Sequence, residues 1–151
     1  MIGSVNVYLY FQGNTEEAFT FYRSVFGGDF TGVVRFRDFP DNPMRIPDHE
    51  LDKIAHISLP LGEATILQGT DIVSSMPPLT VGNNFCITLE TASGAEAGSL
   101  FEALSDGGHV EDPLQPTEWA EKYGICADRF GIHWIVMYTG SAEFALGRGG
   151  L

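Results

Sequence analysis

The feature that most constrains the fold of this chain is an internal repetition, because the same order of strand-like and helix-like segments occurs twice. Residues 14–28 place apolar side chains at helical spacing and end in a glycine pair, and residues 93–108 repeat this pattern at almost the same length. Asn14 and Ser93 are the residue types that cap helix N-termini. The sequence therefore predicts one helix in each half, starting at these two residues.

One strand-like segment precedes each predicted helix, and three follow it. In the first half the segments are 5–11, 32–37, 53–61 and 63–69. In the second half they are 84–90, 109–113, 122–128 and 132–138. We predict a single α+β domain over 1–151, with module one at about 1–70, a connector at 71–83, module two at about 84–139 and a tail at 140–151. Neither module could cover both faces of its sheet alone, so we expect the modules to share a sheet or to pair with another chain.

Residues 38–52 interrupt the first module and carry three prolines and five acidic side chains. This composition predicts an irregular segment. Two interpretations remain open at this point, a solvated loop and a rim or lid over a ligand site, because irregular loops of this length are often functional.

The charge of the chain limits its partners. Eight basic and twenty acidic side chains give a net charge of −12, which would repel nucleic acid and anionic lipid surfaces. No apolar run is long enough to span a membrane, and the first residues lack the basic segment of a secretory signal, so we expect a cytoplasmic protein. Cys86 and Cys126 lie far apart within apolar stretches, which predicts neither a disulfide framework nor a zinc site.

Four segments resemble, in the same order, the PhnB-like branch of the vicinal oxygen chelate superfamily, which is the glyoxalase and bleomycin-resistance fold. They are YLYFQGNTEEAFTFYRSVFGG, HISLPLGEATILQGTD, GNNFCITLETASGAEAGSLFEALSDGGHV and PLQPTEWAEKYGICADRFGIHWIV. One departure is Ala120, where this branch usually has glycine.

The resemblance implies two βαβββ modules that form a curved mixed sheet around a concave cavity, with the helices on the outer face. It also implies a homodimer. The superfamily includes metal-dependent isomerases and dioxygenases, epimerases, thiol transferases and metal-free proteins that sequester drugs, so the fold alone does not select an activity.

Metal enzymes of this superfamily carry one ligand on the first strand and one on the last strand of each module. Alignment on the helix starts and hairpin turns places these four positions at Val7, Leu67, Phe85 and Ile135, with Gln68 one residue away. Hydrocarbon side chains cannot coordinate a divalent cation, so we predict no metal and no other cofactor. The four residues would instead line the floor of an apolar pocket for an organic ligand.

Several other residues are candidates for contacts with a ligand. His56 opens a strand and is our candidate general base, although a structural histidine on a sheet face is an alternative. His133 shares a strand face with Ile135 by alternation and would point to the cavity mouth. Trp119 and Tyr123 could close over a ligand or could serve packing. By the same alternation, Trp134 should pack against a helix, and Tyr8 and Tyr10 should also face away from the pocket.

The first functional hypothesis is a metal-independent protein that binds a small organic molecule in a largely apolar cavity, with or without turnover. One alternative is a metal-dependent lyase or dioxygenase with a displaced metal site, and another is a non-catalytic dimer that sequesters a drug or metabolite. The branch is sometimes labelled as ubiquinone methyltransferases. The chain has no glycine-rich nucleotide-binding turn after a strand, so we expect it to hold no methyl donor.

Overall fold

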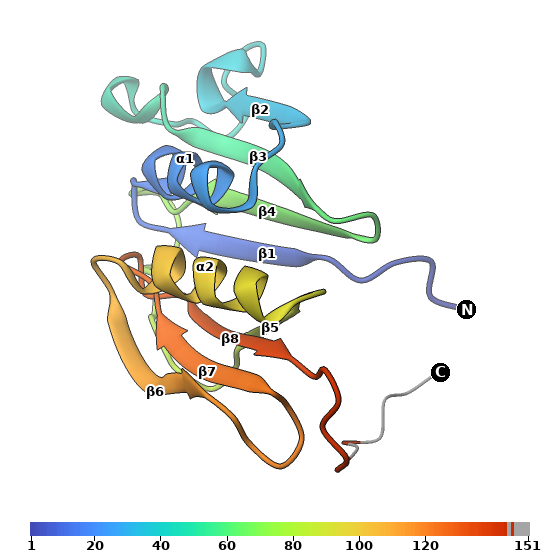
Figure 1. The fold of residues 1–151 in the computed structure, drawn as a ribbon. Coiled ribbons are helices and arrows are strands. Elements are labelled where there is room, and N and C mark those ends of the chain that lie inside the picture. Colours follow the sequence, from blue (N-terminus) through green and yellow to red (C-terminus); the bar gives the residue numbers. More distant parts are fainter. Residues whose placement is uncertain (145, 147–151) are drawn as a thin grey trace. The chain divides into compact units, whose positions relative to one another are not determined.

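The computed structural model describes residues 1–144 and 146, and part of the predicted tail at 140–151 lies outside them. The chain divides into two compact units, unit 1 at Met1–Thr80 and unit 2 from Val81 onward. Each unit contains one α-helix and one four-stranded mixed sheet (Figure 1). The prediction of an α+β fold with strand, helix and three strands in each half is confirmed.

Unit 1 is built from four strands, one α-helix and two short 3-10 helices. These are β1 (Val7–Phe11), α1 (Thr15–Phe26), β2 (Gly32–Arg35), η1 (Phe36–Asp38), η2 (Asp48–Glu50), β3 (Ile54–Leu61) and β4 (Thr65–Asp71). The sheet has the order β1-β4-β3-β2, in which β1 and β4 are parallel and the other neighbours are antiparallel.

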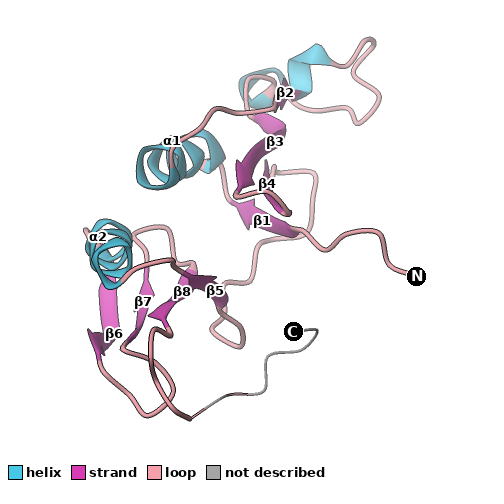
Figure 2. Ribbon diagram, turned by 45° about the vertical axis from the view of Figure 1, so that its right-hand side comes forward, coloured by secondary structure: helices cyan, strands magenta, loops and turns pink. Residues whose placement is uncertain are grey.

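Helix α1 covers one face of this sheet and leaves the other face open (Figure 2). Leu9 and Phe11 of β1 are buried on the covered face, where the ring of Phe11 meets the ring of Phe19 edge-on. Gly69 of β4 lies directly beneath this helix, because a Cβ atom built there would come within 2.5 Å of the Phe19 ring. Side chains alternate along a strand, so Tyr8 points to the open face.

The N-terminus of α1 is capped by a different residue from the one predicted. Asn14 makes no side-chain hydrogen bond to the helix. Instead, the buried carboxylate of Asp71, at the end of β4, accepts hydrogen bonds from the backbone N–H of Thr15 at 3.0 Å and from its hydroxyl at 2.6 Å. Its second oxygen accepts the backbone N–H of Ile54 at 2.8 Å. A long-range carboxylate thus does the work that a local cap was predicted to do.

The segment 38–52 is anchored to unit 1 by a small hydrophobic cluster. Phe36, Ile46 and Val73 are almost fully buried and pack with partly buried neighbours such as Met76. The side chain of Asn42 closes the turn, since it accepts the N–H of Ile46 and donates to the carbonyl of the same residue, both at 2.8 Å.

Unit 2 repeats the plan with four strands and one helix. These are β5 (Ile87–Glu90), α2 (Gly94–Ser105), β6 (His109–Gln115), β7 (Lys122–Ala127) and β8 (His133–Tyr138). The sheet order is β5-β8-β7-β6, with β5 and β8 parallel. The predicted cap at Ser93 is confirmed, because its hydroxyl accepts the backbone N–H of Glu96 at 3.1 Å.

Helix α2 covers one face of the second sheet in the same way (Figure 2). A Cβ atom at Gly124 of β7 would lie 2.7 Å from the ring of Phe101 on α2. Cys126 shares this face, and its register partner Trp134 is fully buried there. The prediction that Trp134 packs against a helix is therefore confirmed. Among the described residues, no helix has the length and apolar character needed to cross a membrane.

Candidate functional site

The open face of unit 1 carries a direct hydrogen bond between two titratable side chains. The hydroxyl of Tyr8, on β1, lies 3.1 Å from Nδ1 of His56, on β3. Register explains the meeting, because Tyr8 and Gln68 are partners across β1 and β4, while Ser58 and Gln68 are partners across β4 and β3. Side chains two apart on β3 share a face, so His56 joins Ser58 on the open side.

The pKa of Tyr8 is raised above its ordinary value, first by burial and then by the neighbouring Tyr10, while a hydrogen bond from Thr70 opposes the rise. The phenol therefore stays protonated near neutral pH. In one tautomer of His56, Tyr8 donates to Nδ1 and the imidazole presents an N–H at Nε2. In the other tautomer Nδ1–H donates to the phenol oxygen and Nε2 becomes an acceptor, so the pair can supply either an acid or a base.

On β1 and β4, the residues predicted to face the pocket are shifted by one position from those that the structure places on the open face. Leu67 is completely buried on the α1 side, and Val7 shares that side with Leu9. The open-face positions are instead Tyr8 and Gln68, whereas the sequence-based prediction placed Val7 and Leu67 on the pocket face and Tyr8 on the opposite one. Tyr8 and Tyr10 retain 42% and 54% of their surface exposed. A slip of one residue exchanges every side chain between the two faces, because strand side chains alternate.

The open face of unit 2 holds most of the predicted residues of the second half. Register pairs His133 with Ala127, Ile135 with Ile125 and Met137 with Tyr123, on the face opposite Trp134. The shared face of His133 and Ile135 is as predicted. Phe85 lies outside β5, and 61% of its surface is exposed.

Sequence reasoning missed the partner of His133. Nδ1 of His133 lies 2.9 Å from a carboxylate oxygen of Glu111 on β6, and the imidazole retains only 16% of its surface. The ladder between β6 and β7 is irregular between Val110 and Asp112, which displaces Glu111 from simple alternation. Nothing in the local pattern of β6 would have shown which face this carboxylate takes.

Trp119, in the loop before β7, packs against Tyr123 at the start of β7. Their rings are 5.3 Å apart between centroids and nearly perpendicular. The indole N–H of Trp119 is buried and has no acceptor among the described residues. The loop between β6 and β7 borders the segment that follows β8, because the backbone N–H of Phe144 donates to the carbonyl of Glu118.

The predicted site residues thus fall into two groups. In unit 1 the open face brings His56 and Gln68 together, with Tyr8 as an unpredicted third member. In unit 2 the open face carries His133, Ile135 and Tyr123, and Trp119 contacts the last of these. Each group is a candidate site in its own unit.

Comparison with known proteins shows the family. Residues 4–137 match the family model described as 3-demethylubiquinone-9 3-methyltransferase. The crystal structure of PA1353 from Pseudomonas aeruginosa is similar at 37% identity and a TM-score of 0.80, over 89% of this chain and 96% of that one. The chain belongs to this PhnB-like family.

Two further structures of lower identity share the fold of the family. A PhnB protein from Bacillus cereus is 20% identical with a TM-score of 0.71, over 89% of this chain and 98% of that one. A glyoxalase/bleomycin resistance protein/dioxygenase from Nocardioides is 16% identical with a TM-score of 0.60, over 97% of this chain and 91% of that one.

The residues of this family member do not fit the superfamily's metal site. The open-face register pairs nearest the positions aligned with the superfamily's ligands are Tyr8 with Gln68 in unit 1 and Thr88 with Ile135 in unit 2. A phenol, an amide, a hydroxyl and a hydrocarbon provide no imidazole, carboxylate or thiolate, the groups with which proteins most often bind divalent transition metals. Among the described residues, no three His, Cys, Asp or Glu side chains converge as metal ligands.

Proposed function

We propose that this protein binds a small organic molecule on the open face of unit 1 and that His56 exchanges a proton with it. The observation that carries the proposal is the hydrogen bond between Tyr8 and His56 on a sheet face that α1 leaves uncovered. An imidazole whose Nδ1 is held by a phenol is oriented for contact with a ligand through Nε2.

The surroundings of this pair favour an uncharged, partly apolar ligand. Apart from His56, the residues that register places on this face carry no formal charge. They are Tyr8, Tyr10, Gly32, Val34, Ser58, Pro60, Ile66, Gln68 and Thr70. Aromatic rings supply apolar contact area, and Gln68 supplies a donor and an acceptor that can orient a polar group.

The name of the matching family model refers to methyl transfer, but we do not extend that reaction to this chain. The sequence lacks a glycine-rich nucleotide-binding turn between a strand and a helix. The proposal also includes a cytoplasmic homodimer, which rests on the resemblance to the superfamily. Sedimentation velocity tests the dimer directly, and a monomer at micromolar concentration would contradict it.

A thermal-shift screen of metabolites and metals tests the binding function, since a specific ligand raises the melting temperature by mass action. Tyr8→Phe and His56→Ala should each weaken the binding of a ligand found in this way. His109→Ala, at an exposed histidine of unit 2, is the matched control and should leave it unchanged. If neither Tyr8 nor His56 affects any ligand, the proposed site is wrong.

Turnover separates an enzyme from a sequestering protein. For an enzyme, His56→Ala should abolish turnover while the affinity for the ligand falls much less. A sequestering protein should instead take up ligand stoichiometrically without product. Near-stoichiometric Zn, Ni, Mn or Fe in protein purified without chelator would favour the alternative of a metal-dependent lyase or dioxygenase.

A further inference from the structure

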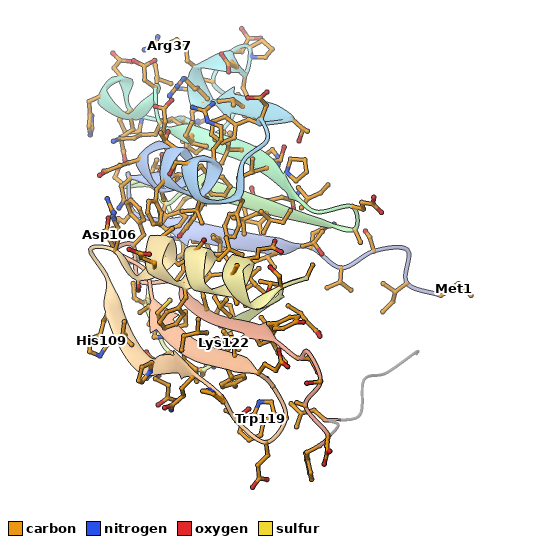
Figure 3. The ribbon with its side chains drawn as sticks, viewed as in Figure 1. Met1, Arg37, Asp106, His109, Trp119 and Lys122 are labelled. Atoms are coloured by element: carbon orange, nitrogen blue, oxygen red, sulfur yellow. The ribbon has the colours of Figure 1, made fainter. Side chains whose placement is uncertain are left out.

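The imidazole of His133, on β8, reaches across β7 to a carboxylate of β6. Nδ1 of His133 lies 2.9 Å from a carboxylate oxygen of Glu111. Register places Ala127 of β7 between the two strands, since Ala127 is the partner of both His133 and His109. Figure 3 labels His109, which begins the edge strand β6. Because the side chain of Ala127 is only a methyl group, it leaves room for the imidazole and the carboxylate to meet.

The carboxylate determines which nitrogen of His133 carries the proton. An ionised carboxylate only accepts hydrogen bonds, so a neutral imidazole donates its Nδ1–H to Glu111 and presents the lone pair of Nε2. Among the described residues, none forms a hydrogen bond with Nε2. The pair in unit 1 differs, because a phenol can donate or accept and so leaves both tautomers of His56 available. The free nitrogen of neutral His133 is therefore a proton acceptor.

Apolar side chains lie next to His133 on the same face of the sheet. Ile135 follows it at two-residue spacing, and Ile125 of β7 is the register partner of Ile135. Both isoleucines are partly buried. They offer contact area to a flat apolar ligand whose polar end lies at the imidazole.

Further titratable groups occur at this end of the sheet. Cys86 is exposed and comes directly before β5, and the carboxylate of Glu111 contributes to raising the pKa of its thiol. His109 and Asp112, both exposed, belong to β6, where Asp112 is the register partner of Ile125. Glu111 is the group that contacts the imidazole, so it is the charge that most directly stabilises a proton on His133.

We propose that the Glu111 and His133 pair is a proton-accepting site for a phenol. The phenol hydroxyl donates to Nε2 of His133, and the ring lies on Ile125 and Ile135. Proton transfer breaks the O–H bond, forms an N–H bond at Nε2 and leaves a phenolate beside an imidazolium, whose charge Glu111 stabilises. An aliphatic alcohol is too weak an acid to give its proton to an imidazole, so the site favours phenols. It lies in unit 2 and can fail independently of the function proposed for unit 1.

4-Nitrophenol tests the proposal, because its phenolate absorbs visible light and the neutral phenol does not. Titration of the phenol, extrapolated to saturating protein, should give an apparent pKa about one unit lower than in water, a tenfold change in proton affinity. The net charge of −12 would by itself raise that pKa, so a fall indicates a local cation. In equilibrium dialysis 4-nitroanisole, which lacks the hydroxyl, should bind roughly fivefold more weakly than the phenol.

Glu111→Gln keeps an acceptor for Nδ1–H and removes the charge that stabilises the imidazolium. It should leave the affinity for the neutral phenol within about twofold and abolish the fall in the pKa of the phenol. His133→Asn should weaken binding and also abolish the fall. Glu63→Gln and His49→Ala, at exposed residues of unit 1, are the matched controls and should change neither quantity. Circular dichroism shows whether each variant is folded.

His56→Ala distinguishes this site from the one proposed in unit 1. A fall in the pKa of the phenol that persists in His56→Ala and disappears in His133→Asn assigns the bound phenol to unit 2. The reverse result would assign it to unit 1 and overturn the inference. Absence of binding, absence of a fall in the unaltered protein, or an equal fall in Glu111→Gln would overturn it as well.

Discussion

The carboxylate of Asp71 binds both the backbone N–H and the hydroxyl of Thr15, and so fastens the end of β4 to the first turn of α1. The two residues are 56 positions apart in sequence. This one buried group therefore links the last strand of unit 1 with its helix, and through the N–H of Ile54 with β3 as well.

Asp71→Asn should lower the free energy of unfolding by about 2–3 kcal/mol. The neutral amide of asparagine would replace the charged carboxylate that now accepts the hydrogen bonds from Thr15 and Ile54. Urea unfolding monitored by circular dichroism measures the change. Asp29→Asn, an exposed change in the same unit, is the control and should shift stability by less than about 0.5 kcal/mol. Equal stability of the two variants would show that Asp71 is not the clamp described.

The two tryptophans should respond differently to replacement by phenylalanine. The N–H of Trp134 donates to the carboxylate of Asp128 at 2.8 Å within the core, whereas the N–H of Trp119 has no described acceptor. Trp134→Phe should destabilise the protein by about 2–4 kcal/mol, and Trp119→Phe by less than about 1 kcal/mol. Thermal and urea unfolding of both variants give the comparison, and the reverse order would contradict it.

The two cysteines should differ in reactivity. Burial raises the pKa of Cys126 to about 11, while Cys86 is exposed and its pKa is raised by partial burial and by the carboxylate of Glu111. A thiol reagent should label one cysteine in the native protein and two in denaturant. Glu111→Gln removes the negative charge, lowers the pKa of Cys86 and should speed its labelling at pH 8. Glu63→Gln should leave the rate unaltered.

The contact between Glu50 and Ser74 should depend on pH. Glu50 accepts hydrogen bonds from the N–H and the hydroxyl of Ser74, and these lower its pKa. The pKa of Glu50 is lower in the folded state than in the unfolded state. The contact therefore stabilises the folded state fully above the unfolded pKa, and this stabilisation is lost as the pH falls through the folded pKa. Hydrogen exchange of the Ser74 amide, corrected for its intrinsic pH dependence, should lose protection only at pH values below the ordinary pKa of a glutamate side chain. In Glu50→Gln this protection should not change with pH.

Much of the fold could be predicted from periodicity and turn residues. Both helices and all eight strands lie where the pattern placed them, within a few residues, because each segment carries its own spacing of apolar side chains. The helix N-terminus of unit 1 could not be predicted, since its ligand is Asp71, distant in sequence. Local patterns contain no information on such a contact.

The candidate site was predicted less completely, for two physical reasons. The covered and open faces of β1 and β4 both carry apolar or aromatic residues, so the pattern did not distinguish Val7 from Tyr8. Alignment from the start of α1 then selected Val7, which lies on the face that α1 covers. Glu111 escaped prediction because an irregular ladder, which has no clear signature in sequence, sets its direction.

Both units place a phenylalanine ring of the helix on a glycine of the sheet, Phe19 on Gly69 and Phe101 on Gly124. Even one methyl group at either glycine would overlap the ring, so the helix would have to shift or the phenylalanine would have to be replaced by a smaller residue. Attempts to redesign the spacing between helix and sheet in this scaffold therefore have to change glycine and phenylalanine together, as a pair, in whichever half is altered.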